Sequence, residues 1–136
     1  MRLTTCISLT VGVMMLMSCD YLQATSGPCR EDEFFCQSPY KQKQLLNTLS
    51  NDKLLKVSRI NYRLFHPPSQ DFAREIARRG IAGIALLGTL NVQNEADVDM
   101  FRDAARAFRK TRNIDLCRSD QSANINVMCG AISKRA

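Results

Sequence analysis

The 136-residue sequence lacks most of the residue arrangements that catalysis requires. It contains one histidine, His66, and no serine or cysteine lies near it at the spacing of a known nucleophile motif. Pro67 and Pro68 follow directly and place His66 at the exit of a predicted strand. A structural or exposed histidine fits this position better than a general base. We therefore expect no enzymatic activity and no cofactor.

Residues with the spacing of a metal site are also missing. On a helix, Asp97 and Asp99 would point about 200° apart, whereas Asp99 and Asp103 would share a face with neighbouring arginines. The cysteines outside the N-terminal region are spaced C-x6-C and C-x11-C, unlike the C-x2-4-C pairs of structural zinc sites. We expect no bound metal.

No apolar run is long enough to favour a membrane-spanning helix. From Leu3 to Ser18 there are sixteen uncharged residues that include several threonines and serines, whereas a spanning helix needs about 20 apolar residues. The run follows the positive charge of Met1-Arg2, an arrangement typical of a secretory signal. The sequence therefore predicts a cleaved signal peptide.

The apolar run ends in Leu16-Met17-Ser18-Cys19, which resembles the lipobox of bacterial lipoproteins. In that family a leucine, a small residue and a cysteine occupy the places of Leu16, Ser18 and Cys19, whereas Met17 is larger than the usual residue. The resemblance implies a lipoprotein signal peptide at residues 1–18 and lipid attached to Cys19. It also implies a membrane anchor, with the remaining chain in the periplasm.

The residue after the expected lipidation site is Asp20, which resembles the sorting signal that keeps enterobacterial lipoproteins in the inner membrane. Cleavage before Cys19 would leave 118 residues, enough for one domain with a modest core. Only Arg2 among the charged residues would be lost, so 18 basic and 13 acidic side chains would remain. Export argues against nucleic acid as a partner, and leaves membrane lipid, polyanionic envelope material or an acidic envelope protein.

Four cysteines remain if Cys6 is removed with the signal peptide and Cys19 carries lipid: Cys29, Cys36, Cys117 and Cys129. An even number in an oxidising compartment predicts two disulfides. We favour pairing each cysteine with its nearer neighbour in the sequence, because short loops close at lower entropic cost. A crossed pairing, which would tie the N-terminal segment to the C-terminal one, stays open.

The hydrophobic pattern predicts helices and strands in alternation. Spacings of three and four predict helices at Gln42–Ser50, Gln70–Arg79 and Asn94–Thr111. Alternating or continuous apolar runs predict strands at Leu55–Phe65, Ile81–Leu90, Ile114–Cys117 and Ile125–Cys129. We therefore expect a single α+β domain at residues 41–136, with helices packed on one face of a small mixed sheet. Residues 19–40 would form a lipidated tether with a disulfide loop.

From Gly83 to Phe108 the pattern also loosely resembles the second half of the BON domain, a small envelope module in which a glycine-flanked strand precedes an amphipathic helix. This chain places Gly83 and Gly88 five residues apart, where that family more often has six. It also inserts a helix between the two predicted strands. We therefore do not extend the lipid-binding function of that family to this protein.

Arginines recur at helical spacing in two of the predicted helices. They form a candidate docking face: Arg74, Arg78, Arg102, Arg106 and Arg109. The interleaved acids Glu75, Asp99 and Asp103 are also typical of an ordinary solvated surface. The preferred hypothesis is a non-enzymatic protein-binding lipoprotein, such as an accessory subunit of a secretion or conjugation system or an exclusion or immunity protein. The alternative is a small envelope hydrolase or cell-wall-modifying enzyme that uses His66.

Overall fold

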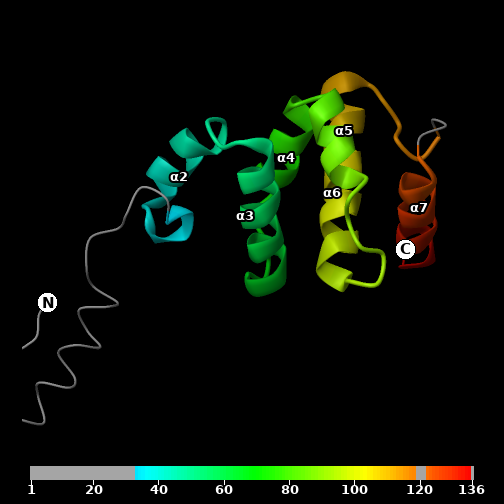
Figure 1. Ribbon diagram of the computed structural model, residues 1–136, viewed down its shortest axis with the longest axis horizontal. Coiled ribbons are helices and arrows are strands. Elements are labelled where there is room, and N and C mark those ends of the chain that lie inside the picture. Colours follow the sequence, from blue (N-terminus) through cyan, green and yellow to red (C-terminus); the bar gives the residue numbers. More distant parts are fainter. Residues whose placement is uncertain (1–32, 119–121, 136) are drawn as a thin grey trace, which may run out of the picture. The chain divides into compact units, whose positions relative to one another are not determined.

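The computed structural model describes residues 33–118 and 122–135 (Figure 1). The predicted signal peptide, the expected lipidation site Cys19, Asp20 and Cys29 lie outside these residues. The chain divides into two units, Met1–Gln37 and Ser38–Ala136. The described part of the first unit contains a short 3-10 helix, η1 (Phe34–Cys36), in which the rings of Phe34 and Phe35 meet edge to face with centroids 5.2 Å apart.

The described part of the second unit is built from α-helices. These are α2 (Pro39–Leu46), α3 (Asn51–Leu64), α4 (Asp71–Arg78), α5 (Ile81–Leu87), α6 (Glu95–Arg112) and α7 (Ala123–Arg135). No strand occurs in residues 33–118 or 122–135. The predicted α+β fold, with helices on one face of a mixed sheet, is therefore wrong.

Helix α3 replaces the predicted strand Leu55–Phe65. Ser50, the last residue of the predicted helix Gln42–Ser50, instead begins α3, because its Oγ accepts a hydrogen bond of 3.2 Å from the Lys53 N–H. The buried residues of α3 repeat at spacings of three and four: Leu54, Val57, Ser58, Asn61 and Tyr62. When such a stripe is read in steps of two it changes phase partway along, so the segment resembles an irregular strand.

Helix α5 replaces the predicted buried strand Ile81–Leu90. Its buried residues, Gly83, Leu86 and Leu87, again follow helical spacing, and Ile81 is 87% exposed. Gly80 separates α4 from α5 with φ 62° and ψ −125°, a conformation open to glycine and strained for other residues. The φ of Gly80 is positive, but its ψ lies outside the left-handed helical region, and the chain then turns into a second helix rather than a strand.

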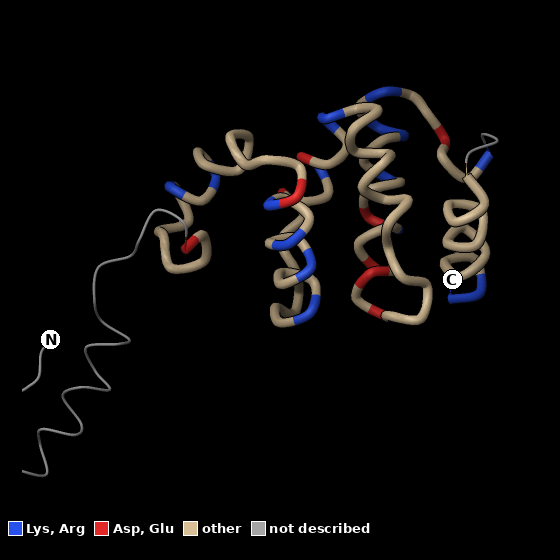
Figure 2. Tube along the Cα trace, in the orientation of Figure 1, with Lys and Arg blue, Asp and Glu red and all other residues tan. Residues whose placement is uncertain are grey.

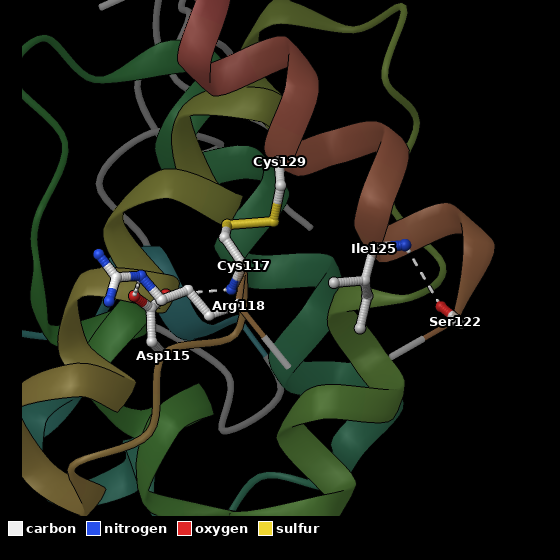
Figure 3. Close-up of a disulfide and its surroundings, with 6 residues drawn as sticks. All are labelled: Asp115, Cys117, Arg118, Ser122, Ile125 and Cys129. Atoms are coloured by element: carbon white, nitrogen blue, oxygen red, sulfur yellow. Dashed lines mark hydrogen bonds and ion pairs between the residues drawn. A yellow bond between two sulfur atoms is a disulfide. The ribbon is translucent and has the colours of Figure 1, made fainter. Parts of the chain in front are cut away.

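The C-terminal region contains a turn and a helix where two strands were predicted. Residues 116–118 form a turn that buries Leu116, and Ile125–Cys129 belongs to α7, so both strand predictions are wrong. A disulfide joins Cys117 to Cys129, with the two Cα atoms 5.5 Å apart (Figure 3). Cys36 is also disulfide-bonded, and its predicted partner Cys29 lies outside the described residues.

The two predicted helices with the clearest boundaries are confirmed. Helix α4 lies within Gln70–Arg79, and α6 matches Asn94–Thr111 to within one residue at each end. Asn94 caps the start of α6, where its Oδ1 accepts hydrogen bonds of 2.9 and 3.2 Å from the Ala96 and Asp97 N–H groups. Asn113 ends α6 with a φ of 55° in the left-handed region. Helix α6 forms the centre of the core and packs against α3, α4 and α7.

Hydrogen bonds that join one helix to another show which helices run parallel and which run antiparallel. Gln70, just before α4, donates to Asp103 Oδ2 at 3.1 Å, and Arg112 at the end of α6 donates to the Ala77 carbonyl at 3.3 Å. Helices α4 and α6 therefore run in the same direction. Arg79, after α4, donates to Asn51 Oδ1 at the start of α3 at 2.8 Å, so α3 runs the opposite way (Figure 1).

Reducing the Cys117–Cys129 disulfide is expected to destabilise the domain by about 3 kcal/mol, because the bond closes a short loop in the unfolded chain. Urea unfolding of a Cys117→Ser/Cys129→Ser double variant, followed by circular dichroism, measures this difference. Adding reductant to the double variant tests the disulfide of Cys36 separately. A double variant with an unchanged unfolding midpoint would contradict the prediction.

Candidate protein-binding site at the ends of α4 and α6

Two hollows in the surface adjoin at Arg78. The smaller, of 250 Å³, lies between α2 and α4 and is lined by Lys43, Leu46, Asn47, Asp71, Arg74, Glu75 and Arg78. The larger, of 470 Å³, is lined by Arg78, Thr111, Arg112 and Ile114, and we call it the arginine hollow. Basic residues gather at the end of the unit where α4 and α6 terminate (Figure 2). The two hollows therefore join a cationic surface to apolar side chains.

Arg78 is held in place by a buried acid on its own helix. Its Nε and Nη2 donate to the two carboxylate oxygens of Glu75 at 2.9 and 2.6 Å. The Glu75 side chain is 7% exposed, whereas that of Arg78 is 60% exposed. The paired edge of the guanidinium thus faces the protein, and Nη1 has no acceptor within residues 33–118 and 122–135.

Glu75 remains ionised because two arginines bind it. Burial by itself raises the pKa of this carboxyl, but hydrogen bonds from Arg78 and Arg79 outweigh burial and lower the pKa below its ordinary value. The bond from Arg79 Nε is 2.9 Å long. Arg79 also donates to the Leu46 carbonyl at 3.2 Å, so its side chain connects α4 to the end of α2.

Arg112 lines the other side of the arginine hollow. Its Nε and Nη2 donate to the Ala77 and Arg78 carbonyls at 3.3 and 3.4 Å, so it caps the C-terminal end of α4 from a different helix. Its Nη1 has no acceptor in the described part of the chain. Two guanidinium groups are thus fixed by protein contacts while each keeps donors for a ligand. Such groups can donate hydrogen bonds to the oxygens of a carboxylate or a phosphate.

The structure separates the arginines of the predicted docking face. Arg74 and Arg78 lie together on α4, where Arg74 also pairs with Asp71 at 2.9 Å. Arg102 and Arg106 instead lie beside the start of α4, since both approach Asp103, at 3.8 and 3.2 Å. The last member of the face, Arg109, is exposed on α6 without an acidic partner in the described residues.

Arg112 was not among the residues predicted for this surface. A basic residue at the end of a helix is an ordinary partner for the helix dipole, and the sequence of α6 suggests only that role for Arg112. Its contact with the carbonyls of α4 depends on how the two helices pack. Thr111 and Ile114 enter the arginine hollow for the same reason.

The described part of the chain gives His66 no hydrogen-bonded acid, serine or cysteine. His66 is exposed in the loop after α3. Residues 33–118 and 122–135 contain no group of three or more metal-binding side chains. None of their helices combines the length and apolar character needed to cross a bilayer.

The chain matches no protein-family model, no curated protein and no solved structure. Its function therefore has to be inferred from its own residues. The feature with the clearest binding chemistry is the arginine hollow, because its charges are positioned by the fold and remain open to solvent.

Acid is expected to weaken the domain through Glu75. Its lowered pKa means that its stabilising contribution is fully present above the ordinary glutamate pKa of about 4.3, and is lost as the pH falls through the lowered value. A Glu75→Gln variant should be less stable than the parent chain at pH 7, and the difference should shrink below about pH 4. Urea unfolding at a series of pH values measures this difference. If the stability difference between the parent chain and Glu75→Gln stayed constant across that pH range, the lowered pKa of Glu75 would be contradicted.

Proposed function

We propose that this protein is a lipid-anchored, non-enzymatic envelope protein that binds an acidic segment of another protein through the arginine hollow. The observation that carries the proposal is the fixed pair Arg78 and Arg112. Arg78 is bonded to buried Glu75 and Arg112 to the carbonyls that end α4, and each keeps an Nη1 without an acceptor among the described residues. Side chains held in place lose less conformational entropy when they bind a ligand.

The lining of the two hollows favours a peptide or protein carboxylate. The arginine hollow combines two guanidinium groups with the hydroxyl of Thr111 and the apolar side chain of Ile114. The neighbouring hollow adds Lys43 and Leu46 at the end of α2. An acidic residue flanked by apolar ones would match this combination, with its carboxylate between the arginines and its neighbours against the apolar side chains.

The resemblance of Leu16–Cys19 to a lipobox supports the proposed location. Lipid on Cys19 would hold the domain at a membrane surface in the periplasm, and Asp20 favours the inner membrane. An oxidising compartment also suits the disulfide between Cys117 and Cys129. In that setting the protein would act as an accessory subunit of a secretion or conjugation system, or as an exclusion or immunity protein.

Site-specific photo-cross-linking in intact cells tests this proposal. A photoreactive residue at Thr111 lies in the arginine hollow, whereas one at Val127, which is 51% exposed on α7, serves as the control. We expect Thr111 to give a discrete cross-linked partner that Val127 does not give. Mass spectrometry of the same purified protein would report whether Cys19 carries lipid.

A charge substitution tests whether Arg78 itself binds the partner. Arg78→Gln leaves buried Glu75 paired with Arg79, so the variant should keep its fold. The matched control is Arg118→Gln, because Arg118 also pairs with an acid three residues away, Asp115, and its side chain is 88% exposed. We expect the cross-link to be lost in Arg78→Gln and kept in Arg118→Gln. Equal cross-linking in both variants would refute the proposed site.

A further inference from the structure

The C-terminal end of α3 exposes apolar side chains next to one another. Leu64 is 64% exposed and Phe65 is 44% exposed. They are followed by His66 and Pro67, which are also exposed, and preceded by exposed Arg63. We call residues 63–67 the α3 tip. Large apolar side chains exposed beside a cation can be buried at the level of the lipid headgroups of a membrane.

The α3 tip is held by the core rather than left loose. Asn61, just before it, exchanges two hydrogen bonds of 3.1 Å with the backbone of Ser69, just after it. Buried Tyr62 donates to Asp103 Oδ2 at 2.8 Å. These contacts fix the backbone on both sides of Leu64 and Phe65.

The charge of α3 selects an anionic surface as the binding partner of the tip. The single acid of α3 is Asp52, in its first turn, whereas Lys56 and Arg63 have no acidic partner in the described part of the chain. A second copy of this chain would bring the same cations against each other. An anionic lipid surface would instead accept both the cations and the apolar side chains.

We infer that the α3 tip rests on the anionic membrane, with Leu64 and Phe65 at the level of the lipid headgroups and Arg63 near lipid phosphates, while Lys56 lies about 12 Å further from the lipid along α3. This inference rests on the proposed lipid anchor, which would keep the domain close to the bilayer. Lipid on Cys19 would keep the domain near the membrane but would not fix its orientation. The α3 tip adds the second contact that orients the domain.

The directions of the helices then place the arginine hollow away from the lipid. The α3 tip lies next to the start of α4, because Tyr62 and Gln70 both donate to Asp103. The arginine hollow lies at the other end of α4, a helix of 8 residues that is about 12 Å long. Glu95 and Asp99, at the start of α6, would be near the membrane too, and both pair with Arg135, at 3.6 and 2.9 Å.

The absence of tryptophan from the sequence allows a direct test in the full-length, acylated protein. Phe65→Trp places a single fluorophore in the α3 tip. Ile81→Trp places one at the start of α5, near the arginine hollow end, at a residue that is 87% exposed. Each protein is reconstituted in vesicles of phosphatidylethanolamine and phosphatidylglycerol, with or without brominated acyl chains. Circular dichroism verifies that both variants fold.

We expect brominated lipid to quench Phe65→Trp and shift its emission to shorter wavelength, while Ile81→Trp keeps the emission of an exposed residue. Adding Arg63→Gln should weaken the contact about fivefold, as judged by the salt needed to abolish quenching. Equal quenching of the two tryptophans, or none in either, would overturn the inference. The inference would also be overturned if the emission shift of Phe65→Trp depended on protein concentration and not on lipid charge, since that result would indicate contact with a second copy of the chain.

A parallel experiment separates this inference from the proposed anchor. The unacylated Phe65→Trp protein is mixed with the same vesicles and with vesicles of phosphatidylcholine alone. If the unacylated protein floats with the anionic vesicles and not with the phosphatidylcholine vesicles, the α3 tip contact is supported even when mass spectrometry finds no lipid on Cys19. If neither the acylated nor the unacylated protein is quenched, the tip contact is rejected. Mass spectrometry of Cys19 then decides separately whether the lipid anchor is present.

Discussion

Gly83→Ala is expected to destabilise the domain by more than about 3 kcal/mol, enough to unfold much of a small domain at physiological temperature. A Cβ atom at residue 83 would lie 1.9 Å from the Ile76 carbonyl oxygen and 2.9 Å from its carbonyl carbon. Both atoms belong to the backbone of α4, so no rotation of a side chain can make room. Helix α5 would have to move away from α4, which would open the core at Leu86 and Leu87.

The matched control for this prediction is Gly130→Ala. Gly130 lies within α7, and a Cβ atom there would meet nothing within 4 Å. Alanine is the better helix former by about 1 kcal/mol, so this variant should be slightly more stable than the parent chain. Urea unfolding followed by circular dichroism measures the stability of both variants. The same substitution should lower stability at residue 83 and raise it at residue 130. Similar unfolding midpoints would show that the α4–α5 contact is looser than described.

Asp103→Ala is the second substitution with a large expected effect, about 3 to 5 kcal/mol of lost stability. Asp103 is 7% exposed and accepts hydrogen bonds from Tyr62 at 2.8 Å, Gln70 at 3.1 Å and Arg106 at 3.2 Å. Its removal would leave the buried hydroxyl of Tyr62 without an acceptor. The acid therefore connects α3, the start of α4 and α6 through one carboxylate.

The matched control for Asp103 lies one helical turn earlier. Asp99 pairs with Arg102 at 3.5 Å and Arg135 at 2.9 Å, but its side chain is 36% exposed. Asp99→Ala should cost less than about 1 kcal/mol, because solvent screens an exposed ion pair. Unfolding midpoints in urea measure both variants. Equal losses from the two substitutions would refute the role assigned to Asp103.

Tyr62 provides an independent check on the same contact. Burial, together with the charge of Asp103, raises the pKa of the Tyr62 hydroxyl well above its ordinary value. Its stabilising contribution is therefore fully present below the ordinary tyrosine pKa of about 10, and is lost as the pH rises above it. The stability difference between the parent chain and Tyr62→Phe should shrink above about pH 10.

The helices that could be predicted from the sequence carry their own boundary signals. Helix α6 has Asn94 as its cap, acids in its first turn, arginines in its last and Asn113 in the left-handed conformation at its end. Helix α4 is followed by Gly80 with a positive φ. These interactions are local, so the residues involved are visible in the sequence. The start of α3 also carries such a cap, Ser50, but it was interpreted as the end of the preceding helix.

The strand predictions failed where burial depends on packing against other helices. In α5, glycine has a low helix propensity, but Gly83 lies where the backbone of α4 passes next to it and leaves no room for a side chain. In α3, the polar residues Ser58 and Asn61 interrupted the apolar pattern, yet both are buried. Asn61 is bonded to the Ser69 backbone, which no local pattern of residues reveals.

Sequence alone is enough to locate α4 and α6 and to show their basic character, because local interactions mark their ends, and it contains the residues that resemble a lipobox. Tertiary packing accounts for the all-helical fold, because a helix with glycine or polar residues on its inner face is stable only against the right neighbour. It also decided which arginines meet. Arg112 reaches Arg78 across two helices, whereas Arg102 and Arg106 turn to the buried Asp103, since a buried carboxylate without a cation would be too costly to keep.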